Sequence, residues 1–285
     1  MLTPLRVVAA SVFDIGRSVL VPGESRKSRM SRLKRALVRF YTRCEREGLL
    51  ERMPAFDERY ADYPELRVFE SAYADIRAEC EALLRVRDWI TDISALGGNY
   101  TKEGIHTARW KAFMLKSGSC IEPNCALAPK TAALLRATPN VYNAFFSILE
   151  PHQHIEPHWG YFKGFVRYHL GVIVPGDNAA RQCWLRVNTD PDDNARREKP
   201  LVERGEKYYW RNGKGVVFDD TNLHDAANES DAVRVVLWLD VFRKLPRPLA
   251  AATRGLLAAA YYAPSIRRIR DNAIVRFPDR VRTDH

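Results

Sequence analysis

The chain has 285 residues, of which 46% are apolar, and a formal net charge of +10. A chain of this size can bury one large core, and it shows no internal repeat or low-complexity tract. Its five cysteines show neither a C-x-x-C pair nor the dense pattern of a disulfide-rich scaffold. An odd number of cysteines without a secretory signal favours reduced thiols, so we expect a cytoplasmic protein.

The positive charge lies at the two ends of the chain. Residues 1–54 hold twelve Lys and Arg against five Asp and Glu, and residues 243–285 hold ten against three, whereas the middle has a net charge of −4. No RNP, helix-turn-helix or zinc-finger pattern accompanies this charge. We therefore expect no nucleic-acid partner.

The N-terminal region predicts a basic amphipathic helix. The first residues are mildly apolar, but charges interrupt them too often for a transmembrane helix. Residues 25–41 then place apolar side chains along one face among many Lys and Arg. Two interpretations stay open: the apolar stripe packs on the core, which we favour, or the helix contacts an anionic membrane. Membrane contact would require segments 26–46 and 265–282 to form one basic surface.

Helices precede and surround the first predicted strand. Pro64 opens a helix whose apolar residues recur every three or four positions as far as residue 84. A strand is expected over 110–115. A short helix is expected over 129–137, because Pro129 suits a first helical position.

Short strands dominate from Tyr142 onward, with a turn at 175–178. The polar stretch 188–207 contains two prolines and predicts an irregular insertion that could cover a substrate. After Phe242 the strands end, and residues 250–262 predict a helix rich in small residues.

Two histidines and two arginines lie in a pattern that suits a metal site with an anionic ligand. His158 is followed 66 residues later by His224 and ten residues after that by Arg234. Neutral imidazoles bind Fe(II), and two on neighbouring strands leave one face of the ion open. Arg234 can bind a carboxylate through two parallel hydrogen bonds. Arg167 and Arg234 both interrupt apolar runs, where a cation is costly to bury unless an anion meets it.

Residues 105–243 resemble the aspartyl/asparaginyl β-hydroxylase family, which includes the bacterial lipid A 2-hydroxylases. The resemblance starts near residues 110–113, continues through 125–135 and ends at Phe242. It implies a mainly β fold: a double-stranded β-helix (jelly-roll, cupin-like) core with flanking α-helices at both ends. It also implies a dioxygenase that uses Fe(II), O2 and, as cosubstrate, 2-oxoglutarate.

The same resemblance implies roles for six residues. His158 and His224 would be the catalytic residues that bind the metal. The other four would bind 2-oxoglutarate, at its distal carboxylate or at its metal-chelating end: Arg234 and Ser147 at the former, Arg167 and His169 at the latter.

The third protein ligand is an open question. Most such oxygenases carry Asp or Glu two residues after the first histidine, and here that position is Gly160. The family lacks this carboxylate, which implies a water in its place. Glu156 stays an alternative, because in an unbroken strand it would share a face with His158. Alanine at position 160 should preserve binding unless the backbone there has a positive φ.

These expectations divide the chain into three regions: a basic N-terminal helical extension (1–54), a double-stranded β-helix oxygenase domain with a leading helix (55–245) and a basic C-terminal helical extension (246–285). The expected reaction is hydroxylation of an unactivated C–H bond in a peptide or amino-acid unit. One alternative is an acyl-chain hydroxylase like the lipid A 2-hydroxylases, in peripheral contact with an anionic membrane. A non-catalytic metal-binding cupin-like module is the alternative from another class.

Overall fold

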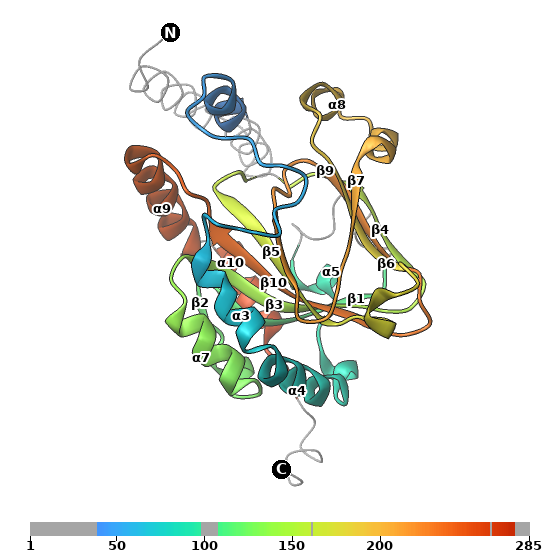
Figure 1. Ribbon diagram of the computed structural model, residues 1–285. Helices are drawn as coiled ribbons and strands as arrows, with labels where there is room; N and C mark the ends of the chain where they lie inside the picture. The colour runs from blue at the N-terminus through green and yellow to red at the C-terminus, as the bar shows by residue number, and fades with distance from the viewer. Residues whose placement is uncertain (1–38, 98–107, 161, 263, 277–285) are drawn as a thin grey trace, which may run out of the picture.

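The computed structural model describes residues 39–97, 108–160, 162–262 and 264–276 (Figure 1). Two antiparallel sheets face each other at its centre. The larger sheet has the order β2 (Ser119–Cys120), β1 (Trp110–Ser117), β3 (Val141–Leu149), β10 (Arg234–Phe242), β5 (Phe165–Ile173) and β8 (Gly215–Phe218). The smaller sheet has the order β4 (Gln153–His158), β9 (Leu223–Asn228), β6 (Cys183–Asn188) and β7 (Glu206–Tyr209).

This strand order is that of a jelly roll. Counted as eight strands from β3 to β10, strands 1, 8, 3 and 6 lie together in one sheet and strands 2, 7, 4 and 5 in the other. Every pairing within each sheet is antiparallel, as two interleaved Greek keys require. The predicted double-stranded β-helix with flanking helices is confirmed.

Alternation along the strands separates two cores. On β5, the residues Val166, Tyr168 and Leu170 belong to the core between the larger sheet and its covering helices. The intervening Arg167 and His169 line a cavity between the two sheets. Successive strand residues point to opposite faces, so a polar residue at every second position of an apolar strand is directed to the interior of the barrel.

Helices cover the outer face of the larger sheet (Figure 1). They include η1 (Pro64–Leu66), α3 (Arg67–Ser71), α4 (Tyr73–Leu84) and α7 (Pro129–Ala137), with η2 (Arg87–Trp89), α5 (Ile93–Leu96) and α6 (Glu122–Cys125) beside them. The helix over 129–137 is as predicted. The single helix predicted from Pro64 to residue 84 is instead divided at Ala72, where φ is −93° and ψ is 13°.

The stretch 188–207, predicted to be irregular, contains α8 (Pro191–Arg196) and η5 (Lys199–Arg204). The side chain of Asp190 accepts hydrogen bonds from the backbone N–H groups of Asp192 and Asp193, and Pro191 occupies the first turn. Asp-Pro is therefore a helix-start signal that the prediction overlooked. A further short turn, η4 (Pro175–Asn178), lies at the predicted turn.

The described ends of the chain pack on the barrel. In helix 39–46, Phe40, Tyr41 and Cys44 form a small core with Leu249 of α9 (Arg247–Tyr261). Thus the described end of the predicted basic helix packs through its apolar side chains, and its earlier part lies outside the described residues.

The C-terminal basic segment packs elsewhere. Helix α10 (Pro264–Ala273) contacts α5 and β1, and Arg270 donates to the carbonyl groups of Ser117 and Ser119. Helix 39–46 and α10, the described parts of the two segments expected to form one basic surface, therefore rest on different elements. Within the described part of the chain, every helix is too short or too polar to cross a lipid bilayer.

Candidate active site

All six predicted site residues line one cavity between the two sheets. Four come from the larger sheet and two from the smaller one: Ser147 on β3, Arg167 and His169 on β5, Arg234 on β10, His158 on β4 and His224 on β9. Aromatic side chains, among them Trp210 and Trp238, complete the wall.

His158 and His224 lie opposite each other in register across β4 and β9, with ring centroids 4.1 Å apart. Each ring uses Nδ1 in the same way. Nδ1 of His158 donates to the carbonyl of Glu156 at 2.7 Å, and Nδ1 of His224 donates to the carbonyl of Asn222 at 2.8 Å. A carbonyl oxygen only accepts, so Nδ1 carries the proton and Nε2 keeps its lone pair.

Burial keeps both rings neutral. Burial, with smaller contributions from the charges of Arg167 and Lys199, lowers the pKa of His158 to about 4 despite the opposing hydrogen bond to Glu156. Burial and the neighbouring His158 hold the pKa of His224 well below its usual value. At neutral pH the chain thus presents two adjacent imidazole lone pairs, the form in which histidine binds a metal ion.

Glu156 does not join this pair. The register between β4 and β9 shifts between Ile155 and His158, a β-bulge, so that these two residues both face the interior. The side chain of Glu156 is half exposed on the other side and lies 3.6 Å from Nδ1 of His154. Among the described residues, no third His, Cys, Asp or Glu joins the two histidines in a group that could hold a metal. The alternative of a direct Glu156 ligand is wrong.

Gly160 is required by its neighbour Asp220. A Cβ atom at position 160 would clash with the carboxylate of Asp220, and the backbone N–H of Gly160 donates to the Asp220 carbonyl at 2.8 Å. Asp220 therefore fills the space that a side chain at position 160 would need. The backbone at Gly160 does not have a positive φ, so an alanine there would meet a steric obstacle, the Asp220 carboxylate, and not a conformational one.

Arg234 is a buried cation with few partners. Its side chain is 2% exposed, Nε has no hydrogen-bond partner, and Nη1 reaches the Ser147 carbonyl only at 3.5 Å. The guanidinium lies over the Trp210 ring, 4.5 Å from its centroid. Burial lowers the pKa of Arg234 to about 10. Because a buried charge without an anion is costly, this group is suited to bind an anionic ligand inside the cavity.

Ser147 lies beside Arg234 at this end of the cavity. Its hydroxyl accepts a hydrogen bond from Nε1 of Trp110 at 2.9 Å. The hydroxyl proton is then available to a second acceptor. Ser147 and Arg234 together offer a neutral and a charged donor to one carboxylate.

Arg167 is held by carboxylates of the protein itself. It donates to Asp240 through Nε and Nη2 at 3.1 and 3.0 Å, and its Nη1 lies 2.9 Å from Asp220. Its guanidinium also stacks on Trp238 at 3.8 Å. The argument that a bound anion must compensate Arg167 is therefore corrected: Asp220 and Asp240 do so.

His169 has both ring nitrogens buried without a hydrogen-bond partner. Burial, together with the charges of Arg167 and Arg234, holds its pKa well below the usual value. The ring lies between Phe218 and Trp238, at centroid distances of 5.0 and 5.1 Å. A neutral imidazole with unsatisfied nitrogens facing a cavity is available to a ligand there.

Sequence reasoning missed Asp220 and Asp240. Burial and the nearby Asp240 raise the pKa of Asp220 to about 6, against the lowering effect of Arg167. A usable signal was present for Asp240, which interrupts the apolar run of β10 just as Arg167 interrupts β5. The two residues face each other in the sheet register.

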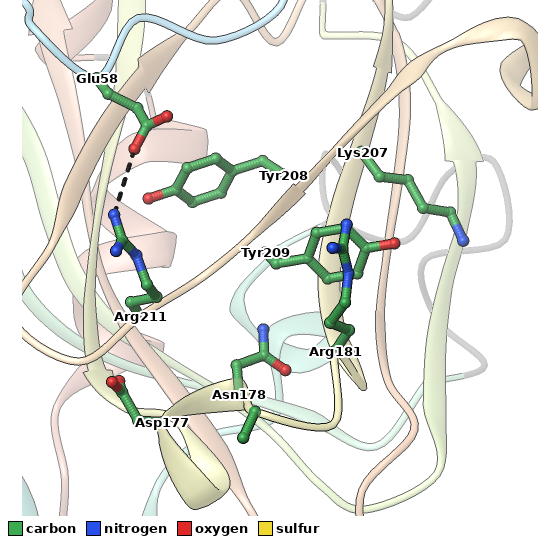
Figure 2. A pocket seen from close by; sticks show the side chains of 9 residues that line it. Glu58, Asp177, Asn178, Arg181, Lys207, Tyr208, Tyr209 and Arg211 are labelled. Carbon is green, nitrogen blue, oxygen red and sulfur yellow. Dashed lines mark ion pairs between the residues drawn. The ribbon is translucent and has the colours of Figure 1, made fainter.

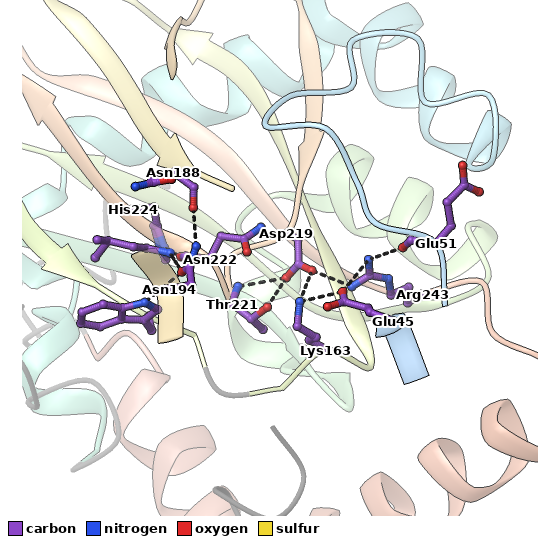
Figure 3. Close-up of polar contacts among 12 residues, drawn as sticks. Glu45, Glu51, Lys163, Asn188, Asn194, Asp219, Thr221, Asn222, His224 and Arg243 are labelled. Carbon is purple, nitrogen blue, oxygen red and sulfur yellow. Dashed lines mark hydrogen bonds and ion pairs between the residues drawn. The ribbon is translucent and has the colours of Figure 1, made fainter. Parts of the chain in front are cut away.

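A buried charge network supports the turn before His224 (Figure 3). Asp219 accepts from Arg243 at 2.7 Å and from Lys163 at 3.1 Å, and Lys163 also donates to Glu45 of helix 39–46 at 2.8 Å. Burial opposes the charged carboxylate, but the two cations outweigh it and hold the pKa of Asp219 far below its usual value. The network fixes the turn that carries Asp220.

A second hydrogen-bonded group holds the other side of His224 (Figure 3). The side-chain oxygen of Asn194 in α8 accepts from Nε1 of Trp159 at 3.0 Å and from the backbone N–H of Leu223 at 2.7 Å. Helix α8 is thereby attached to residues adjacent to both histidines. The stretch 188–207 therefore lies beside the two histidines.

A larger groove of about 470 Å³ lies elsewhere, along β7 (Figure 2). Its lining mixes charges of both signs, and Glu58 lies 3.8 Å from Arg211 across it. None of the six predicted residues lines this groove. Size alone does not make it the active site, because the neutral histidines and the poorly compensated arginine lie in the smaller cavity.

Comparison with known proteins agrees with this geometry. The sequence model described as aspartyl/asparaginyl β-hydroxylase matches residues 70–244. An ornithine lipid ester-linked acyl 2-hydroxylase of Rhizobium tropici is 32% identical over 77% of this chain and 71% of its own length. The human aspartyl/asparaginyl β-hydroxylase is 27% identical over 47% of this chain, which spans 16% of that relative.

Among solved structures, the non-heme α-ketoglutarate-dependent carbocyclase SnoK from nogalamycin biosynthesis aligns with a TM-score of 0.38 and 16% identity, over 61% of this chain and 75% of that one. The family match extends over most of the described barrel and includes all six predicted site residues. The chain belongs to the aspartyl/asparaginyl β-hydroxylase family, a family of hydroxylases.

Proposed function

We propose that the protein is an Fe(II)- and 2-oxoglutarate-dependent hydroxylase. The observation that carries this proposal is the combination, in one cavity, of two neutral imidazoles that keep their Nε2 lone pairs and a buried arginine without a carboxylate partner. A simple metal-binding module would need the histidines but has no use for a buried cation beside them. This argues against a non-catalytic cupin-like module.

The residues present fit the expected groups. His158 and His224 would bind Fe(II) through Nε2. Arg234, with the Ser147 hydroxyl, would bind the distal carboxylate of 2-oxoglutarate, and the unsatisfied nitrogens of His169 would face its other end. Arg167 is held by Asp220 and Asp240 and would contribute positive charge beside that end. With no third protein ligand among the described residues, a water would complete the site.

The chemistry would come from the bound groups, and the protein would orient them. Fe(II) with O2 and 2-oxoglutarate supplies an oxidant strong enough for an unactivated C–H bond. Per turnover, one O2 would supply one oxygen atom to the hydroxyl group and one to succinate, and 2-oxoglutarate would lose CO2. The aromatic walls formed by Trp110, Trp210 and Trp238 would exclude water from the reaction.

For the substrate, we propose the acyl chain of a polar lipid. The relative named for this activity matches most of the chain and most of its own length, whereas the human aspartyl/asparaginyl β-hydroxylase is matched over 16% of its length. A peptide or amino-acid unit stays the second candidate, supported by that human match. Peripheral contact with an anionic membrane belongs to the lipid proposal.

The test is succinate formation from 2-oxoglutarate in the presence of Fe(II), with product masses measured for ester-linked acyl lipids and for Asp- and Asn-containing peptides. We expect a mass gain of one oxygen on a lipid, and loss of this product in Arg234→Leu and His158→Ala. Succinate that forms equally in His158→Ala would contradict the metal assignment. Oxygen gained by a peptide alone would establish the second candidate.

A further inference from the structure

Two of the five cysteines lie side by side at the edge of the larger sheet. Cys120 ends β2, the edge strand of this sheet (Figure 1), and Cys125 ends α6, the short helix that follows. A side-chain hydrogen bond joins the two thiols. Both side chains pack in the core between the sheet and its covering helices, so the pair lies outside the cavity of the candidate active site.

Hydrogen bonds to β1 hold the pair together. The carbonyl of Leu115 accepts from the backbone N–H of Ile121 at 2.9 Å and from the thiol of Cys125 at 3.3 Å. The next residue of β1, Lys116, is opposite Cys120 in register. The segment that carries both cysteines is thus bound to two neighbouring residues of one strand. Thiols held next to each other in this way react with each other faster than with a thiol from solution.

Helix α10 gives the same segment a second support. Arg270 of this helix donates to the carbonyl of Cys120 at 3.0 Å. Asn124, which lies between the two cysteines, donates to the carbonyl of Met114 on β1 at 2.7 Å and to that of Ala273 in α10 at 2.8 Å. The segment 119–125 is therefore fixed from two sides, and its two thiols stay in contact without any change in the fold.

The two thiols differ in their access to solvent. Cys120 is partly exposed, whereas the other four cysteines of the chain are buried. Burial, together with the neighbouring Cys120, raises the pKa of Cys125 to about 11, so this thiol keeps its proton at neutral pH. A reagent from solution therefore meets Cys120 first, and Cys125 is the thiol that can react with the product.

We propose that Cys120 and Cys125 form a redox-active pair that hydrogen peroxide converts to a disulfide. The Cys120 thiolate attacks one peroxide oxygen and the O–O bond breaks, giving a sulfenic acid and a hydroxide ion that takes up the proton lost by the thiol. Cys125 then attacks the sulfenic sulfur, the S–O bond breaks, and the hydroxyl group leaves with the Cys125 proton as water. Two thiols and one hydrogen peroxide thus give one disulfide and two waters, and a thiol reductant reverses the change.

Mass spectrometry of the full chain after treatment with hydrogen peroxide tests the proposal. When the protein is then denatured and its remaining thiols are alkylated, the number of alkylated cysteines should fall from five to three. Trypsin releases residues 117–130 as one peptide that contains both cysteines of the pair and no other cysteine. This peptide should be unalkylated and two hydrogen atoms lighter than its reduced form, and dithiothreitol should restore both thiols.

Single serine variants separate the two steps of the reaction. Cys125→Ser should stop the reaction after the first step, so that Cys120 is recovered as a sulfenic acid that dimedone labels. Cys120→Ser should leave Cys125 free for alkylation after denaturation, because burial shields its thiol from peroxide in the folded chain. The control is Cys80→Ser, which removes another buried thiol of the same core and should leave the disulfide unchanged. Circular dichroism verifies that each variant is folded.

The proposal would be overturned if all five thiols of the peroxide-treated wild type could still be alkylated, or if Cys120 were oxidised while Cys125 stayed a free thiol. A disulfide that forms in urea but not in the folded protein would overturn it as well, because the fold would then not bring the thiols together. These outcomes leave the metal and cosubstrate assignments unaffected, since the residues assigned to those roles line a separate cavity.

Discussion

Replacing Arg234 by Met should stabilise the protein in the absence of its cosubstrate. Burial lowers the pKa of Arg234 from its usual 12.5 to about 10. A pKa difference of this size corresponds to about 3 kcal/mol. The charged guanidinium lowers the free energy of unfolding by about this amount. Met has a similar unbranched shape and no charge. Exchanging buried ions for apolar residues commonly gains about 1–4 kcal/mol, so we expect a gain of about 1–3 kcal/mol in the free energy of unfolding.

The same replacement should remove the response to 2-oxoglutarate. Urea unfolding with and without 2-oxoglutarate, in the presence of Mn(II), measures both effects in one experiment. At 100 times its dissociation constant, a ligand stabilises the folded state by about 2.7 kcal/mol. The wild type should show this gain and Arg234→Met should not. Arg234→Lys keeps the charge but not the planar fork, and should respond in part.

The reasoning would be refuted if Arg234→Met were less stable than the wild type and still gained stability from 2-oxoglutarate. That result would mean that the arginine has a compensating partner within the protein and that the cosubstrate binds elsewhere.

Three further changes test the histidine pair and its supports. His158→Ala should abolish stoichiometric Fe(II) binding, measured by metal analysis after desalting, while circular dichroism stays unchanged; full metal retention would exclude the site. Gly160→Ala should lower hydroxylation more than it lowers Fe(II) binding, because the new methyl group must displace Asp220 from Arg167; unchanged turnover would show that Asp220 can move freely. Asp219→Asn should cost about 3–5 kcal/mol at pH 7, since it removes the carboxylate that lies 2.7 Å from the buried Arg243 and leaves Glu45 at 4.0 Å. The pKa of Asp219 is depressed in the folded state, so its contribution to the free energy of unfolding is present above the unfolded pKa of about 3.8 and is lost as pH falls below it. The difference in free energy of unfolding between wild type and variant, measured by urea unfolding, should therefore become smaller at low pH. A difference that does not change with pH would contradict the ionic explanation.

Much of the fold follows from local patterns. Alternation along β5 and β10 identifies strands with an apolar outer face, and Pro129 marks the start of α7 correctly. Helix α8 was missed because its capping residue Asp190 lies in a polar stretch where no apolar period announces a helix. Periodicity detects a helix that packs on a core, whereas α8 is held by its cap and by Asn194.

The site was predictable where a polar residue interrupts an apolar strand. His158, His224 and Arg234 are found together, as their spacing indicated. The sequence does not show which of the two arginines in the cavity is paired with a carboxylate. That Arg167 is paired and Arg234 is not depends on Asp220 and Asp240, which approach Arg167 from a turn and from a neighbouring strand. The β-bulge that turns Glu156 outward also arises from pairing between strands and leaves no mark in the sequence of β4 alone.

Under the proposed function, the carbonyl groups that orient the imidazoles of His158 and His224 have a consequence for how the enzyme would respond to iron supply. A main-chain carbonyl fixes the orientation of the ring, but it makes the imidazole a weaker base than a carboxylate partner would. Hydrogen-bond partners of metal-binding histidines commonly change metal affinity by about 10–100-fold. With two protein ligands of this kind, we expect the ion to exchange with the surrounding pool. Occupancy would then follow the free iron concentration of the cell, so protein from iron-starved cells should be intact and inactive until Fe(II) is returned.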